Sequence, residues 1–120
     1  LLDAVQALWE SGILFIASAG NDASSNDRIP RYPSSSYLPN VLSVTATNIC
    51  EVRPEYANIG LTTVHLGAPA DYILSTVPGN AYQFKYGTSM AAAHAPERER
   101  SQSGLEGHQE LAAGSRPTGR

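Results

Sequence analysis

A serine among small residues is the first feature of this sequence that could support chemistry. It lies in Gly87-Thr88-Ser89-Met90-Ala91, where small neighbours leave room for a substrate backbone. An alanine-rich segment follows and predicts a helix that begins near Ser89, because alanine has the highest helix propensity. Unpaired amide groups and the positive dipole end of such a helix favour an oxyanion beside the hydroxyl. The motif suits a nucleophile, but serine is also a preferred helix cap.

An asparagine at a strand end is the second such feature. The segment Ile13–Ala17 is continuously apolar, which predicts a strand buried on both faces, as in a parallel sheet. The strand leads into Ala19-Gly20-Asn21. In α/β sheets the functional crevice lies beyond the carboxyl ends of the strands, and Asn21 stands at such an end. As a residue that tolerates left-handed backbone, it could equally be a plain turn residue.

The remaining segments predict an α/β fold around these two residues. The apolar residues between Leu1 and Trp9 recur at the spacing of a helix. We expect Asp3 to cap this helix and Gly12 to end it. Polar residues and prolines predict a surface loop over 22–40. Strands are expected over 41–47, 63–66, 72–77 and 82–86, with Pro78-Gly79-Asn80 as the turn between the last two and Tyr82, Phe84 and Tyr86 on one face.

Composition narrows the possible partners. The chain has 120 residues, 42% of them hydrophobic, and a net charge of −3, which argues against a nucleic-acid surface. No apolar run is long enough to predict a membrane span. Cys50 is the only cysteine, so an intrachain disulfide is impossible, and we expect an inert residue, as lone buried cysteines usually are, and not a reactive thiol. Residues 95–120 are polar and poor in large apolar side chains, which predicts a disordered tail.

Several segments together resemble the C-terminal part of the catalytic domain of subtilisin-like serine proteases, the subtilase family. The resemblance spans residues 1–94 and implies a three-layer α/β fold with a mainly parallel sheet, here a fragment. Ala93 and Pro96 depart from the family pattern, and Pro96 would disrupt a longer helix. The similar segments are Ile16-Ala17-Ser18-Ala19-Gly20-Asn21, Tyr32-Pro33, the strand from Pro39 to Ala46, Tyr56-Ala57-Asn58-Ile59-Gly60, the turn Leu66-Gly67-Ala68-Pro69-Ala70, and Gly87-Thr88-Ser89-Met90-Ala91.

The resemblance implies a serine endopeptidase that cleaves polypeptides through an acyl-enzyme. Ser89 would be the nucleophile, and the Asn21 amide and the Ser89 backbone N–H would stabilise the oxyanion. No cofactor or metal residue is implied in this chain, although a full-length relative could bind calcium. A secreted or extracytoplasmic location is expected, and the oligomeric state is not predicted. The substrate pocket would be lined by Ala17, Ser18, Ala19, Gly20, Tyr32, Pro33 and Ser34.

The general base is the part of the machinery that the sequence lacks. In subtilisin the triad order is Asp, His, Ser, so both partners would precede Leu1. His65, His94 and His108 do not stand where the family has its base, and His94 matches a structural histidine of the family. We therefore expect the isolated chain to be inactive.

Three alternatives remain open at this point. One is an α/β-hydrolase fragment with Ser89 in a nucleophile elbow, although no aspartate follows Ser89 to complete its triad. Another is a non-catalytic module that binds a nucleotide phosphate at Gly20-Asn21, although no glycine-rich phosphate motif follows a strand. The third is a truncated subtilase that only binds.

Overall fold

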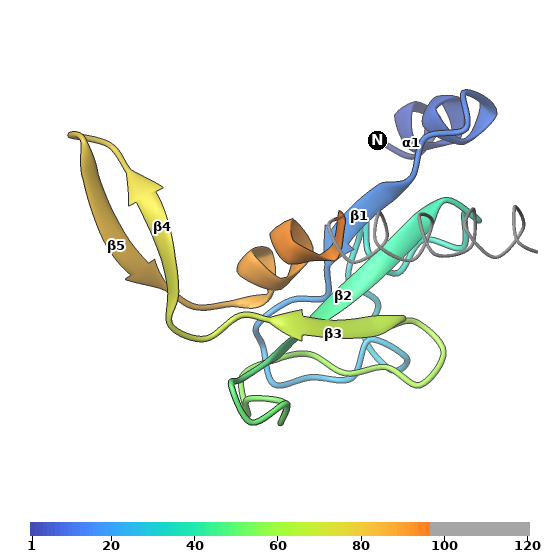
Figure 1. The fold of residues 1–120 in the computed structure, drawn as a ribbon. Coiled ribbons are helices and arrows are strands. Elements are labelled where there is room, and N and C mark those ends of the chain that lie inside the picture. The colour runs from blue at the N-terminus through green and yellow to red at the C-terminus, as the bar shows by residue number, and fades with distance from the viewer. Residues whose placement is uncertain (97–120) are drawn as a thin grey trace, which may run out of the picture.

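A parallel three-stranded sheet forms the centre of the chain (Figure 1). The computed structural model describes residues 1–96. The strands are β1 (Phe15–Ser18), β2 (Val41–Thr47) and β3 (Leu66–Pro69), with β2 in the middle. Phe15 pairs with Val41 and Val44 pairs with Leu66, both in parallel register. The predicted α/β fold with a mainly parallel sheet is confirmed.

Two helices flank this sheet in the chain. Helix α1 (Leu2–Glu10) precedes β1 and buries Val5. The Asn40 side chain fixes its position, since it donates to the carbonyl oxygens of Val5 and Ile13, both at 3.1 Å. Asp3 lies in the first helical turn, the N-cap is Leu1, and no side chain caps the helix, so the predicted Asp3 cap is wrong.

A second helix begins at residue 88, as expected from the alanine-rich segment, and continues through residue 96. Its Ala91 and Ala95 belong to the hydrophobic core, so the helix packs through small side chains that allow close approach to the sheet. Ala95 is therefore buried helix although the predicted tail begins there, and the helix includes Pro96. The rest of that tail, with His108, lies outside the described residues. The other buried core members are Val44, Ala46, Ala57, Ala68 and Ala70.

An antiparallel hairpin projects from this body (Figure 1). Its strands are β4 (Ile73–Val77) and β5 (Ala81–Lys85), joined at the predicted turn, where Gly79 and Asn80 have φ of 87° and 55°. The aromatic side chains of β5 and the residue after it are exposed, with fractions of 73% for Tyr82, 62% for Phe84 and 75% for Tyr86. Of these three, Tyr86 meets the ring of Tyr56 edge to face.

Two strands differ from their predicted positions. The first was expected over Ile13–Ala17 with both faces buried, but β1 starts at Phe15, and Ile13 and Leu14 are 48% and 47% exposed. The Ile13 amide still bonds to Leu8 of α1, and β1 is an edge strand, so fewer neighbours cover it than the apolar run suggested.

The third strand was expected over residues 63–66 but occupies Leu66–Pro69, where a turn was expected. The reason is that Asp27 holds the preceding residues in a turn: its carboxylate accepts hydrogen bonds from the Leu61, Thr62 and Thr63 amides. Cys50 is exposed in the loop after β2, so its expected inertness does not follow from burial.

Candidate functional site

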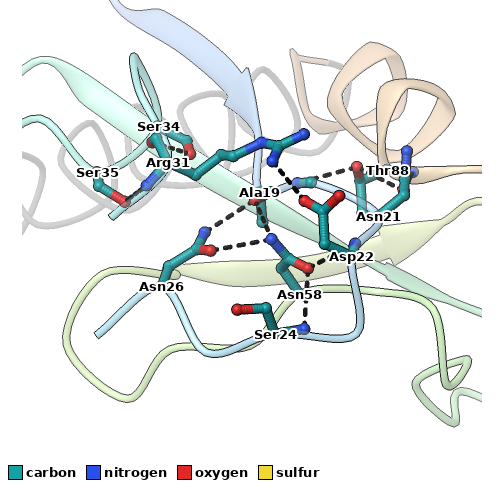
Figure 2. Close-up of polar contacts among 11 residues, drawn as sticks. Ala19, Asn21, Asp22, Ser24, Asn26, Arg31, Ser34, Ser35, Asn58 and Thr88 are labelled. Atoms are coloured by element: carbon teal, nitrogen blue, oxygen red, sulfur yellow. Dashed lines mark hydrogen bonds and ion pairs between the residues drawn. The ribbon is translucent and has the colours of Figure 1, made fainter. Parts of the chain in front are cut away.

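The turn that follows β1 and the turn that precedes helix 88–96 meet through the side chains of Asn21 and Thr88 (Figure 2). The Asn21 amide oxygen accepts from the Thr88 backbone N–H at 2.9 Å and from its hydroxyl at 3.0 Å. The Thr88 hydroxyl also accepts from the Gly20 N–H at 3.2 Å. Because both bonds use the Asn21 oxygen, its NH₂ group is the part left to donate to a ligand.

Ser89 lies beside this junction, in the first turn of helix 88–96, and is exposed. Gly87 has φ of +128°, a backbone conformation that L side chains rarely adopt. A Cβ added to Gly87 would lie 3.5 Å from the Asn21 Nδ2 atom, so the asparagine amide packs directly against this turn. Amide groups in the first turn of a helix have no intrahelical acceptor, and the dipole end is positive. The structure thus brings together the two residues that the sequence singled out.

Such an arrangement suits acyl transfer, because an exposed hydroxyl lies next to amide donors that can stabilise an oxyanion. A serine hydroxyl also needs a base that takes its proton. Neither described histidine contacts Ser89: the His65 Nδ1 atom accepts from the Ser43 N–H at 2.8 Å, and the His94 Nδ1 atom lies 2.9 Å from the Met90 carbonyl. Within residues 1–96 the candidate nucleophile and the candidate donors are therefore present, and neither histidine is placed to act as a base for Ser89.

Two buried asparagines, which the sequence analysis missed, hold the turn that carries Asn21 (Figure 2). Asn26 and Asn58 are 0% and 1% exposed, and each donates from its amide to the Ala19 carbonyl, at 2.8 and 3.1 Å. The Asn58 side chain also donates to the Asn26 oxygen at 3.0 Å. The one sequence signal was the aromatic-x-Asn-x-Gly turn that contains Asn58.

The oxygen of Asn58 faces the other way and accepts from the backbone amides of Asp22 and Ser24, at 2.8 and 3.2 Å. Its own backbone N–H donates to the Gly20 carbonyl at 2.9 Å. One fully buried side chain therefore fixes the backbone on both sides of Asn21.

The residues predicted to line a pocket come from two segments that lie close together. Ala17, Ala19 and Gly20 are buried at the end of β1, and Ser18 is half-buried. The second segment is the loop at Tyr32–Ser34, in which the Tyr32–Pro33 peptide is cis, Tyr32 is 59% exposed and Pro33 is half-buried. The Ser34 hydroxyl is buried and donates to the Arg31 carbonyl at 2.8 Å, so it is engaged in holding the loop. Their contact with substrate remains a prediction.

A charged pair at this position was not anticipated from the sequence. Arg31 Nη1 lies 2.5 Å from Asp22 Oδ2, and the two side chains are 53% and 48% exposed. The Arg31 Nε atom lies 3.3 Å from the point where Gly20 would carry a Cβ. The arginine therefore crosses the backbone of the residue before Asn21 (Figure 2).

A tyrosine pair includes Tyr86, the residue before Gly87. Tyr56 Oη donates to Asp71 Oδ1 at 2.5 Å, and the rings of Tyr56 and Tyr86 meet edge to face at 5.9 Å. Partial burial, together with the bond to the Asp71 carboxylate, raises the pKa of Tyr56 well above its usual range. Tyr56 is therefore neutral at neutral pH and acts as a hydrogen-bond donor.

Comparisons with known proteins, by sequence and by structure, agree with one another. A family model described as the subtilase family (peptidase S8) matches residues 2–97. Subtilisin-like protease 2 of Plasmodium falciparum is 42% identical over 84 residues, which are 69% of this chain and 6% of that protein. An intracellular serine protease of Paenibacillus polymyxa is 38% identical over 94 residues, 78% of this chain and 28% of that protein.

A solved structure, that of the prenylagaramide maturation protease PagA, matches with a TM-score of 0.65 at 31% identity. The match covers 77% of this chain and 32% of that one. The chain thus spans about a third or less of the lengths of the proteins named here. None of the helices within residues 1–96 has the length and apolar character needed to cross a bilayer.

Proposed function

Since the chain belongs to the subtilase family, we propose that it supplies the nucleophile and the oxyanion-stabilising donors of a serine endopeptidase. Ser89 Oγ attacks the carbonyl carbon of a peptide bond, and its proton passes to a base. The oxyanion accepts hydrogen bonds from Asn21 Nδ2 and from the Ser89 backbone N–H. The base returns this proton to the leaving nitrogen, so that collapse of the tetrahedral intermediate expels a neutral amine and leaves an acyl-enzyme, which water then hydrolyses.

One observation carries this proposal: Thr88 bonds to both the backbone of Gly20 and the side chain of Asn21. These contacts orient the asparagine amide next to the residue that precedes Ser89. Donors that are held before the reaction need no reorganisation as charge develops, and this preorganisation lowers the barrier.

The base and the carboxylate that orients it would come from a segment N-terminal to these residues, following the subtilisin order. The 120-residue chain alone is then inactive. Family membership disfavours both the α/β-hydrolase reading and the phosphate-binding module. A subtilase that only binds is the remaining alternative. Secretion stays a proposal, because one of the named relatives is called intracellular.

The test is a fusion of this chain behind the segment that precedes the matched region in the Paenibacillus polymyxa protease. A fluorophosphonate should form an adduct with Ser89 in the fusion protein and leave the isolated chain unlabelled. Ser89→Ala should abolish peptide hydrolysis, whereas Ser11→Ala should not, because the Ser11 hydroxyl donates to the Ala7 carbonyl at the end of α1, in another part of the chain.

Asn21→Ala separates oxyanion stabilisation from substrate binding. In subtilisin, where this quantity was measured, loss of the oxyanion-hole asparagine costs roughly 10²–10³-fold in kcat. We expect a loss of that order in kcat with KM little changed. An adduct at another residue, or equal effects on kcat and KM, would contradict the assigned roles. A folded fusion protein without turnover would support the alternative of a binding protein.

A further inference from the structure

The Arg31–Asp22 ion pair flanks Asn21, the residue to which we assign stabilisation of the oxyanion. Asp22 follows Asn21 in the chain, and the Arg31 side chain crosses Gly20, which precedes it. Both charged groups are about half-exposed, so a ligand can reach them. Figure 2 shows Arg31 extending from its loop to Asp22 beside the Asn21–Thr88 contacts.

The backbones that carry these two charges are held rigidly. Arg31 donates its N–H to the Ser35 hydroxyl at 2.9 Å and accepts from the Ser34 hydroxyl and the Ser35 N–H at 2.8 and 2.7 Å. Ser34 and Ser35 are 1% and 4% exposed. Asp22 is fixed through the buried Asn58, as described above. The two backbones are thus held in place, whereas the half-exposed side chains form a surface ion pair.

The next step rests on the proposed function. A substrate carbonyl in contact with Asn21 Nδ2 lies within about 3 Å of that atom. Gly20 and Asp22 flank Asn21 in the chain, and the Arg31 side chain lies over Gly20, so a long side chain on the residue that owns this carbonyl could reach the arginine.

The donor inventory decides which charge is preferred. A guanidinium carries five N–H donors in a planar fork that suits bidentate binding of a carboxylate. Within residues 1–96 the Arg31 guanidinium has one polar partner, Asp22. The positive end of helix 88–96 lies at the same junction and disfavours a cationic side chain there. A carboxylate can therefore use the donors that Asp22 leaves, whereas a lysine would compete with Arg31 for Asp22.

We propose that Arg31 is a specificity-determining residue that selects an acidic side chain, aspartate or glutamate, on the substrate residue whose carbonyl is attacked. Asp22 moderates this selection because it occupies part of the guanidinium. Removing Arg31 should abolish the preference, and removing the Asp22 charge should strengthen it.

The test measures binding of N-acetyl-Ala-Ala-Xaa amides to the isotope-labelled 120-residue chain by NMR, with glutamate, glutamine or lysine as Xaa. At low ionic strength we expect the glutamate peptide to bind roughly fivefold more tightly than the glutamine peptide, as a half-exposed charge pair allows. Arg31→Gln should equalise the two peptides, and Asp22→Asn should increase their ratio. Arg31→Gln should lower the ratio of glutamate to glutamine peptide binding and Asp22→Asn should raise it, so loss of folding cannot explain both results.

Arg28→Gln is the matched control, because Arg28 is an exposed arginine in the same loop and its loss changes the net charge equally. It should leave the ratio unchanged. In the fusion protein, the ratio of kcat/KM for glutamyl and glutaminyl substrates gives a second measurement. Hydrolysis without an acidic preference would overturn this inference and leave the proposed function intact. If the glutamate peptide binds preferentially but no substrate is hydrolysed, the inference about Arg31 is supported and the proposed function is contradicted. Two other outcomes would also overturn the inference. One is that the chain binds none of the peptides and the fusion protein shows equal kcat/KM values for both substrates. The other is a preference for glutamate that survives Arg31→Gln.

Discussion

Replacing Asn58 by aspartate tests whether the buried asparagine pair holds the turn that carries Asn21. The Asn58 oxygen accepts from the Asp22 and Ser24 amides, and its NH₂ group donates to the Ala19 carbonyl and to Asn26. Aspartate has the same shape and keeps the two bonds that its oxygen accepts. It loses both donated bonds and places an oxygen against two other oxygens.

The expected cost follows from the number of groups that lose a partner. Two donated bonds are lost, but the Ala19 carbonyl keeps its bond from Asn26, so only the Asn26 oxygen loses its partner. A buried polar group left unsatisfied costs about 1–3 kcal/mol. The site is 1% exposed, so an ionised carboxylate adds a desolvation penalty. We expect Asn58→Asp to lower the free energy of unfolding by about 3–5 kcal/mol at neutral pH. In acid the cost should shrink, because a protonated carboxyl can donate one of the two lost bonds.

Urea denaturation followed by circular dichroism measures this change, and amide exchange at Asp22 and Ser24 localises it. Asn48→Asp is the matched control. The Asn48 oxygen accepts from the Cys50 and Val52 amides at 2.9 and 3.0 Å, and within the part of the chain that the structure describes its NH₂ group donates no bond. That variant should stay within about 0.5 kcal/mol of the wild type. A loss below about 1 kcal/mol for Asn58→Asp, or equal losses for the two variants, would refute the reasoning.

Two further predictions concern Thr88 and Asp27. Thr88→Val keeps the buried shape but leaves the Gly20 N–H without its acceptor, so the free energy of unfolding should fall by about 1–3 kcal/mol and exchange of the Gly20 amide should accelerate; unchanged exchange would contradict this. Hydrogen bonds from Thr63 and its neighbours lower the pKa of Asp27 from 3.8 to about 2. Because the pKa is lowered in the folded state, the ionised Asp27 contributes stability that is fully present above pH 3.8. This contribution is lost as the pH falls through about 2. The stability difference between wild type and Asp27→Asn should therefore shrink over that window, and a difference that is constant with pH would exclude this role.

Periodic patterns and turn chemistry predicted several elements correctly. Strand β2 occupies residues 41–47 as predicted, because its apolar residues face a core on both sides and its burial pattern is nearly continuous. The β4–β5 turn was predicted from Pro78-Gly79-Asn80, since two of its residues need positive φ, which glycine and asparagine tolerate. The position of Asn21 beyond the carboxyl end of β1 also follows from the sheet rule.

The shift of β3 shows where local patterns fail. Residues 63–66 have the composition of a strand, yet Asp27, more than thirty residues earlier, bonds to Thr62 and Thr63 and holds them in a turn. The strand then forms where β2 offers partners, from Leu66 to Pro69. A contact between two distant segments decided the boundary, and no window of sequence contains both.

The supports of the candidate site were missed for a related reason. Irregular turns after β1 leave backbone groups without ladder partners, among them the Ala19 carbonyl and the Gly20 N–H. Buried backbone groups of this kind must find a partner, so side chains from other segments must supply one. Asn58 and Thr88 do so here. The need for such partners can be foreseen from any irregular turn beside a reactive residue, but which residue meets it depends on the fold. Substitutions at Asn58 or Thr88 can therefore alter the site without any contact between these side chains and the substrate.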